Sequence, residues 1–591
     1  MASPTTGRPF RPRRILWASL GVLGVVVVFT AVWIGVRGLL LRSEVDAAVA
    51  AATEMRQQLE ASDFAAAQDS ATDLTAHAHS AADLAGDPIW RAAESIPYVG
   101  ANLTAARVVS TQLDRLSSRA VVPVLHLADD LDSIWSDGRV DIDSLASAST
   151  PLDEALAAVQ GARRAIAALD PLTLVGPLRS GIEQLDGYIA NAEPIVEGAG
   201  LAAATIPAVL GGDGARSILV MLQNGAELRT GGGLTGAFAE LRADEGSLEL
   251  VDQASSADFP RLSQPISELP ASVSTLLDDA VGRYVMNISS PADFTVSAEL
   301  ASDWWELRTG HRPDTIVSVD VPVLAALLAV VGPVEVDGWG QLSSENLVQR
   351  LLIDPYVALA PEDQDILFQS VVRDVFTRAL EVDIDVPALI AQLSGPVDEG
   401  RVSVWSAYPD VQAILQDSAF AGSQGRQAQA GKGAYAVYFN DLTGGKMDTY
   451  LDVTIDASVA ACREDKRRDI AVAVTLTNTA PADAGSIYPA WLTGGGTQGV
   501  PAGEIGTLVA VSAPPGTFRS GVRQDGELVY SANGEGDSFV VNQSRLDLAP
   551  GDSETLVFHF IAALPGGLEP QILHTPLLRP PHVTVTDVGC P

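Results

Sequence analysis

Residues 218–241 read ILVMLQNGAELRTGGGLTGAFAEL, and this run gathers side chains that could bind an anion. Asn224, Glu227 and Arg229 lie between two apolar segments, and the glycines 231–233 follow directly. Arginine can hold phosphate or carboxylate through two parallel hydrogen bonds. Glycines let the backbone approach a bulky group and can expose N–H donors. A second interpretation stays open: Glu227 and Arg229 form an ion pair beneath a loop, and the glycines make a turn.

The surrounding pattern predicts an α/β domain over residues 211–430. Residues 217–222 are typical of a buried strand and residues 315–320 (TIVSVD) of another, followed by a helix over 322–331. Strands interleaved with helices indicate a layered domain with a central sheet. A strand that ends at Asn224 would place its polar residues at the carboxyl edge of the sheet, where open sheets usually bind ligands.

Two further regions flank this domain. In residues 43–207, apolar residues recur at three- and four-residue steps, which predicts a helical bundle or stalk. Glycine and proline breaks divide it into about five helices; they lie at 86–88, 96–100, 136–138 and Pro171. Residues 433–591 alternate apolar and polar residues between turn signals, which is typical of a β-sandwich.

The N-terminus predicts a membrane anchor. Residues 15–36 carry no charge and are long enough to cross a hydrocarbon core of about 30 Å. Arginines dominate residues 1–14, so the positive-inside rule favours a cytoplasmic tail, with residues 43–591 outside the cell. The alternative is a cleaved signal peptide, but its apolar region would be shorter. We therefore expect an uncleaved single-pass anchor.

Charge and cysteine content restrict the partners. The formal net charge is −37, which argues against nucleic-acid binding because that binding requires a basic surface. Cys462 and Cys590 are the two cysteines, and an isolated pair in an extracytoplasmic region predicts a disulfide. A zinc site would need more ligands, and the histidines near them show no ligand spacing.

Most catalytic signatures are absent from the sequence. It contains no Walker A motif, no G-x-S-x-G motif and no H-E-x-x-H motif. Any catalysis would therefore depend on arginine, aspartate, glutamate and asparagine side chains, and we assign no catalytic residue.

The opening run resembles the hallmark of a membrane-anchored bacterial family, catalogued as domain of unknown function 4012 (DUF4012). That hallmark is similar to LLLFQN-x-x-E-x-R-x-x-GG-F-x-G, and here ILVMLQN is followed at matching positions by Glu227, Arg229, Gly232, Gly233 and Gly236. Further segments that fit the family are DPIWRAAESIPYVG (87–100), YVMNISSPADF (284–294), TGHRPDTIVSVDVPVLAALLAVVGPVEVDG (309–338), LSSENLVQRLLIDPY (342–356) and NDLTGGKMDTYLD (440–452).

Residues 309–338 are also similar, more distantly, to the LytR–CpsA–Psr family. Its members are anchored phosphotransferases that move glycopolymers from polyprenyl-pyrophosphate carriers to peptidoglycan. Their sites use arginines and an aspartate around a pyrophosphate and a divalent cation such as Mg²⁺. The family's S-x-P-R-D box is missing here, and residues 363–376 keep only Arg373 of its arginines. The resemblance implies that Arg229 is the phosphate-facing residue.

Together these observations predict an α+β multidomain envelope protein of an actinobacterial type of cell. Its expected parts are a cytoplasmic tail, a transmembrane helix, an extracytoplasmic helical domain, a LytR–CpsA–Psr-like α/β domain with a central sheet, and a C-terminal β-sandwich, over residues 1–14, 15–36, 43–207, 211–430 and 433–591.

The expected function is binding or transfer of a lipid-linked phosphorylated glycan during envelope glycopolymer assembly, with a polyprenyl-phosphate-linked glycan and peptidoglycan as partners. The alternative is a non-catalytic scaffold with a degenerate LytR–CpsA–Psr-like domain. Asp293 and Asp320 lie at element boundaries in segments that match the family, so they join the predicted ligand-binding residues Asn224, Glu227, Arg229, Gly232 and Gly233.

Overall fold

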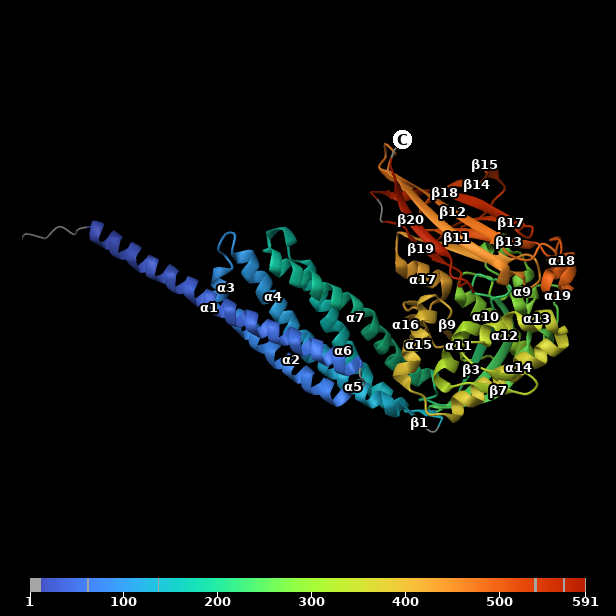
Figure 1. Ribbon diagram of the computed structural model, residues 1–591, viewed down its shortest axis with the longest axis horizontal. Coiled ribbons are helices and arrows are strands. Elements are labelled where there is room, and N and C mark those ends of the chain that lie inside the picture. Colours follow the sequence, from blue (N-terminus) through green and yellow to red (C-terminus); the bar gives the residue numbers. More distant parts are fainter. Residues whose placement is uncertain (1–11, 61–62, 137, 536–538, 567–568, 590–591) are drawn as a thin grey trace, which may run out of the picture. The chain divides into compact units, whose positions relative to one another are not determined.

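The computed structural model describes residues 12–60, 63–136, 138–535, 539–566 and 569–589 (Figure 1). The fold is mixed α+β, as the sequence predicts, and the chain forms two compact units. The first unit contains residues up to Leu131 and Ser144–Ala204, and the second contains Asp132–Asp143 and Thr205–Pro591. The five domain boundaries expected from sequence remain predictions, because this division into two units does not test them.

The first unit is helical. The four predicted breaks are confirmed: Gly86 caps one helix, residues 94–99 and 135–141 separate others, and Pro171 begins a short 3-10 turn. Small alanines on facing helices, with Leu103, Val159 and Ile189, form the buried core. The helices are α1 (Pro12–Glu60), α2 (Phe64–Ala85), α3 (Pro88–Ala93), α4 (Gly100–Leu116), α5 (Val122–Ile134), α6 (Ile142–Ala167) and α7 (Gly176–Val209).

Helix α1 is compatible with the predicted membrane anchor. In the part of the chain that the structure describes, one helical segment, 24–59, is long enough and apolar enough to cross a membrane. Several large apolar side chains between residues 24 and 36, including Val25 and Val28, are more than half exposed. In a membrane, lipid acyl chains cover such an apolar surface, so these side chains are not exposed to water. The side of the membrane on which each end lies remains a prediction.

The second unit contains a seven-stranded sheet in the order β1-β2-β5-β4-β3-β6-β9. Strand β3 pairs antiparallel with β4 and parallel with β6, so the carboxyl ends of β3 and β6 lie at the same edge. The predicted strand over 315–320 is confirmed as β6. The strands are β1 (Trp135–Ser136), β2 (Arg139–Val140), β3 (Arg216–Asn224), β4 (Leu234–Asp244), β5 (Ser247–Ser255), β6 (Thr315–Asp320) and β9 (Ser403–Ser406).

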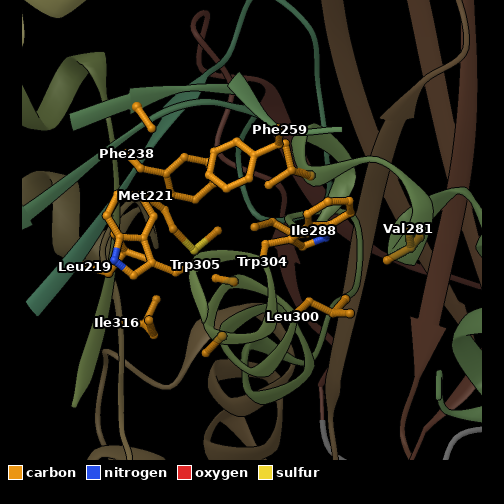
Figure 2. Packing of buried hydrophobic residues seen from close by; sticks show 14 of the residues in the cluster. Leu219, Met221, Phe238, Phe259, Val281, Ile288, Leu300, Trp304, Trp305 and Ile316 are labelled. Carbon is orange, nitrogen blue, oxygen red and sulfur yellow. The ribbon is translucent and has the colours of Figure 1, made fainter. Parts of the chain in front are cut away.

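The main core of this unit lies between the sheet and α10 (Phe294–Thr309). Leu219 and Met221 of β3 point to this side with Phe238 of β4, and Trp304 and Trp305 of α10 pack against them with no exposed surface (Figure 2). The ring of Phe238 lies 6.0 Å from that of Trp305. Because side chains alternate along a strand, the even-numbered residues of β3 point to the opposite side of the sheet.

Helices α11 (Val321–Val331) and α14 (Pro361–Glu381) contact that opposite side. Val334–Val336 and Gly340–Leu342 form a small hairpin, β7–β8. The remaining helices of the unit are α8 (Ala271–Leu277), α9 (Ala280–Arg283), α12 (Leu347–Leu352), α13 (Asp354–Ala358), α15 (Val386–Asp398), α16 (Pro409–Gln416), α17 (Gly422–Ala430), α18 (Ala484–Ile487) and α19 (Ala490–Thr493).

The C-terminal β region, residues 434–588, contains two sheets, ordered β16-β17-β13-β10-β19 and β15-β14-β18-β12-β11-β20. Tyr435 of the first sheet and Phe560 of the second pack with ring centroids 5.7 Å apart. The strands are β10 (Ala434–Asp441), β11 (Leu451–Ala460), β12 (Arg467–Asn478), β13 (Ile505–Ala513), β14 (Phe518–Gln524), β15 (Glu527–Val529), β16 (Ala532–Glu535), β17 (Val540–Leu548), β18 (Ser553–Pro565), β19 (Gln571–His574) and β20 (His582–Val588).

The predicted disulfide joins Cys462 to Cys590, and Cys590 lies outside the described residues. The pairing of these two cysteines stays a prediction from the sequence.

Candidate functional site

A cavity of about 200 Å³ lies at the carboxyl edge of β3 and β6. Apolar side chains form most of its wall, among them Leu222, Leu324, Leu351, Phe368 and Val372. Its polar lining consists of Gln223, Asn224, Ser256, Asp320, Tyr356, Gln364, Asp365 and Lys446. The cavity therefore lies where the strand pattern predicts a ligand site, but its lining is more apolar than the opening run suggests.

The loop that carries the motif, residues 225–233, lies beside this edge and docks on the C-terminal β region. The carbonyl of Ala226 accepts a hydrogen bond from the backbone of Asp448, and the carbonyl of Leu228 accepts one from Asp441. The Thr230 N–H donates to Asn440 Oδ1 at 3.2 Å. These bonds form a seam between the motif loop and residues 440–448, which we call the docking seam.

Arg229 lies inside this seam and is only 7% exposed. Its Nη2 donates to Glu227 Oε1 at 2.8 Å and to Asn287 Oδ1 at 2.9 Å, and its Nη1 donates to the carbonyl of Leu228 at 2.8 Å. Nε also donates to Asn287 Oδ1, so every guanidinium nitrogen already has a protein acceptor. Arg229 does not line the cavity. The second interpretation of the motif, a buried Glu227–Arg229 ion pair, is confirmed.

Glu227 has two cationic neighbours. Its other carboxylate oxygen pairs with Lys446, a residue distant in sequence. Burial alone would raise the pKa of Glu227, but Lys446 and Arg229 outweigh it and lower the pKa below the ordinary value. The carboxylate is therefore paired on both sides and links Arg229 to Lys446.

The three glycines form a turn whose N–H groups are all used within the protein. Gly231 donates to the Ser289 carbonyl, Gly232 to the Arg229 carbonyl and Gly233 to Gln223 Oε1. A Cβ on Gly233 would lie 2.3 Å from the backbone of Asn224, which only glycine avoids. The expected cradle of exposed N–H donors, which included Gly232 and Gly233, is therefore corrected to a close-packed turn.

Among the motif residues predicted to bind a ligand, Asn224 lines the cavity. It ends β3; its Oδ1 accepts from the Ala226 N–H at 3.0 Å, and its Nδ2 donates to the hydroxyl of Tyr356. The Lys446 ammonium lies 5.7 Å from the centre of the Tyr356 ring, a cation–π contact. Asn224, Tyr356 and Lys446 thus form the polar end of the cavity.

The two aspartates predicted from element boundaries are both helix N-caps. Asp293 accepts the Thr295 N–H at the start of α10 and does not line the cavity. Asp320 caps α11 through the Val323 N–H, lines the cavity, and pairs with Arg401 Nη1 at 2.6 Å. The structure therefore brings Asp320, but not Asp293, to the same cavity as Asn224.

Two further carboxylates lie in the docking seam. Asp441 accepts the backbone N–H groups of Thr443 and Gly444, and burial with the nearby Glu227 raises its pKa to about 6. Asp448 accepts the Leu228 N–H at 2.6 Å, while its other oxygen is buried without a partner. Burial and the proximity of Asp441 raise the pKa of Asp448 well above its ordinary value.

These raised pKa values make part of the stability pH-dependent. A carboxyl whose pKa is higher in the folded state binds a proton more tightly there, so its contribution to stability falls as pH rises through that pKa. We expect Asp448→Asn to be more stable than the parent at pH 8, by about 1 kcal/mol or more, because a buried unpaired acceptor becomes a neutral amide. The difference should vanish near pH 4.

Urea unfolding of the two proteins at pH 4, 6 and 8 measures this effect. Asp452→Asn is the control, because Asp452 is an exposed carboxylate of β11 that is half accessible in its pair with Arg579. An equal stability difference at all three pH values would contradict a raised pKa of Asp448 as its cause.

The family model of DUF4012, a protein family of unknown function, matches residues 213–356. The chain is a DUF4012 domain-containing protein. No curated protein matches it. A solved structure, protein gbs0355 from Streptococcus agalactiae, is similar over 35% of this chain and 74% of its own, with 14% identity. Its TM-score of 0.22 is too low to support an argument about fold or function. The comparisons do not confirm the similarity to the LytR–CpsA–Psr family.

The DUF4012 match ends at Tyr356, so several residues of the site lie beyond it. Sequence reasoning did not select Asn287, Tyr356, Asp441, Lys446 or Asp448. A signal for them was nevertheless present, because all five belong to segments that resemble the family, 284–294, 342–356 and 440–452. The structure shows that these segments meet at one place around the motif loop. Arg401 belongs to none of these segments and could not have been found in this way.

A metal role is not apparent among the residues described. No group of three or more His, Cys, Asp or Glu side chains in that part of the chain is placed to hold an ion. The acidic side chains nearest the DUF4012 motif are bound to arginine, lysine or backbone N–H groups instead.

Proposed function

We propose that this DUF4012 protein is an extracytoplasmic, membrane-anchored envelope protein that binds a lipid-linked phosphorylated glycan. In this proposal the chain has an anchor, a helical stalk, an α/β domain of the LytR–CpsA–Psr type and a β-sandwich. The observation that carries the proposal is the cavity at the carboxyl edge of β3 and β6, with a mostly apolar wall and a few polar side chains. Ligand pockets commonly combine an apolar lining with a few placed polar groups.

The cavity suits part of an apolar chain next to a charged group. Its wall comes from β3, α11, α12 and α14, and supplies leucine, valine and phenylalanine side chains. Lys446, at the polar end, is the cationic residue of the lining; it also pairs with Glu227, so a bound phosphate would share its ammonium group with that carboxylate. Asp365 also lines the cavity, where burial raises its pKa. Asp320 is neutralised by Arg401.

Binding without transfer agrees best with the state of the arginines. Glycopolymer transfer of the LytR–CpsA–Psr type uses arginines to hold a pyrophosphate. Here Arg229 donates to Glu227 and Asn287, and Arg401 donates to Asp320, Glu399 and the carbonyl of Leu577. Freeing Arg401 would leave the buried Asp320 without its cation, and freeing Arg229 would leave the buried Glu227 with Lys446 alone; both losses are costly. We therefore favour a carrier or presenting role over phosphotransfer.

The scaffold alternative is supported by the docking seam. Its buried charges and backbone bonds join the motif loop to residues 440–448, so the hallmark of the family holds two regions of the chain together. A protein that only assembles partners would need this seam and no ligand in the cavity. Ligand binding therefore decides between the two functions.

Filling the cavity tests the proposal. Leu324 points into it from α11, and we expect Leu324→Trp to weaken binding of a polyprenyl phosphate at least about tenfold, since it occupies the space of the apolar chain. Val372→Phe fills the cavity from α14 and should do the same. Binding of the detergent-solubilised full chain is measured by tryptophan fluorescence and by calorimetry, with the melting temperature followed in parallel.

Ile366→Trp is the matched control, because Ile366 lies on α14 but is 65% exposed and outside the cavity. It should bind as the parent does. The corresponding polyprenyl alcohol, which lacks the phosphate, should bind more weakly if Lys446 contributes. Parent protein that shows no affinity for polyprenyl phosphate would refute the binding function and leave the scaffold.

A further inference from the structure

Two loops of the helical unit expose large apolar side chains at one end. Residues 95–99 connect α3 to α4, and Ile96, Tyr98 and Val99 are 45%, 97% and 48% exposed. Residues 171–175 precede α7, and Leu172 and Val175 are 88% and 56% exposed. We call these five side chains the apolar loop patch. Water-facing loops are normally polar, and clustered apolar exposure indicates an interaction surface.

The two loops form one surface because Asn102 joins them. Its Oδ1 accepts the Val175 N–H at 2.8 Å, and its Nδ2 donates to the Thr173 carbonyl at 3.4 Å. Tyr98 has a φ of 68°, a left-handed conformation that is unfavourable for a residue with a side chain. The backbone conformation at the exposed Tyr98 is therefore energetically costly. Backbone strain of this kind is typical of functional positions.

The patch lies near the level at which the apolar segment of α1 ends. Trp33 Nε1 donates to Asp87 Oδ1 at 3.2 Å, and Arg37 Nη1 donates to the Leu84 carbonyl at 2.9 Å. Asp87 caps α3, which is about 9 Å long, and the first loop follows α3 directly. Figure 1 shows both loops at the end of the helical unit from which the N-terminal half of α1 extends.

The charges around the patch suit the surface of a bilayer. No charged residue occurs between Glu94 and Arg107, or between Asp170 and Arg179, in a chain that is otherwise strongly acidic. Glu94 is neutralised by Arg107 at 2.6 Å, and Asp87 pairs with Arg37. Tyrosine and tryptophan favour the membrane–water interface, where an apolar ring and a polar atom are both accommodated.

We infer that the apolar loop patch inserts into the outer leaflet of the same membrane that α1 crosses. The helical unit then contacts the bilayer at three places, the span and the two loops, which restricts its tilt relative to the membrane. The inference rests on the membrane anchor of the proposed function, but not on ligand binding in the cavity.

Photocrosslinking to lipid tests this inference on the full chain. The protein is reconstituted in nanodiscs that contain a phospholipid with a photoreactive acyl chain, and lipid adducts are mapped after trypsin digestion. The arginine positions give separate peptides for the span (15–37), the first loop (92–107) and the second loop (165–179). We expect adducts on all three.

The adjoining peptide 180–216 is the internal control. It carries Tyr188 and Ile195, which are 68% and 72% exposed on α7 but lie farther along the helix from the patch. We expect no adducts there. The variant Ile96→Ser/Tyr98→Ser/Leu172→Ser should lose about tenfold or more of the loop adducts, because its loops have less apolar surface to bury in lipid. Its melting temperature and the labelling of 15–37 should not change.

Each other outcome is informative. Adducts on 15–37 without adducts on either loop would overturn the inference, keep the anchor and leave the patch to a protein partner. Equal labelling of 180–216 would show non-specific reaction and would also overturn it. Absence of adducts on 15–37 would refute the anchor itself, and with it the membrane placement in the proposed function.

Discussion

Replacing Arg229 by alanine should lower the free energy of unfolding by about 3–5 kcal/mol, the usual cost of removing one partner from a buried ion pair. The change removes the hydrogen bonds to Glu227, Asn287 and the Leu228 carbonyl from a residue that is only 7% exposed. Glu227 would keep Lys446 alone. Chemical denaturation of the detergent-solubilised full chain, followed by tryptophan fluorescence, measures the loss.

Arg579→Ala is the matched control for this variant. Arg579 pairs with Asp452 at 2.7 Å, nearly the distance in the Glu227–Arg229 pair, but both side chains are half exposed. Solvent screens such pairs, so the expected loss is below about 1 kcal/mol. Unchanged stability of Arg229→Ala, together with a tenfold or greater loss of polyprenyl-phosphate binding, would instead support the phosphate-facing role that the resemblance implies.

Replacing Arg401 by alanine should have an effect of similar size, about 3–5 kcal/mol at neutral pH. Arg401 is 8% exposed, pairs with Asp320 and Glu399, and donates to the carbonyl of Leu577 in the C-terminal β region. Its loss leaves the carboxylate of Asp320 buried at the start of α11 with only a backbone N–H. Thermal and chemical unfolding of the variant measure the effect.

The pH dependence separates loss of charge pairing from simple loss of packing. Burial already raises the pKa of Asp320, although Arg401 acts to lower it, and without Arg401 the pKa should rise further. The folded variant would then bind a proton more tightly than the unfolded chain, so it regains stability as pH falls through the folded pKa. We expect a smaller loss at pH 5 than at pH 8.

The double variant Asp320→Asn/Arg401→Met provides the second comparison. It removes both charges and retains an apolar stem of similar length, so it should be more stable at pH 8 than Arg401→Ala alone. A loss for Arg401→Ala that is the same at both pH values would show that packing, and not the unpaired Asp320, determines the effect.

The sequence by itself determined the features that depend on neighbouring residues. A short, largely apolar run predicts a buried strand at residues 315–320, where the structure has β6, because such a run depends only on neighbouring residues. Glycine and proline end helices through their own backbone limits, so the breaks at Gly86 and Pro171 were also predictable. The apolar segment that precedes Arg37 likewise needs no tertiary information. The hallmark of the DUF4012 family was visible for the same reason.

Only the tertiary structure decided what the motif does. The sequence left Arg229 either facing a phosphate or paired with Glu227, since both uses need the same residues at the same spacing. The structure pairs Arg229 with Glu227, and the further partners Asn287 and Lys446 come from segments far along the chain. The same holds for Asp320, whose partner Arg401 no motif indicates. Burial and charge pairing depend on which distant segments meet, and the low dielectric of a buried site then fixes which pairs must form.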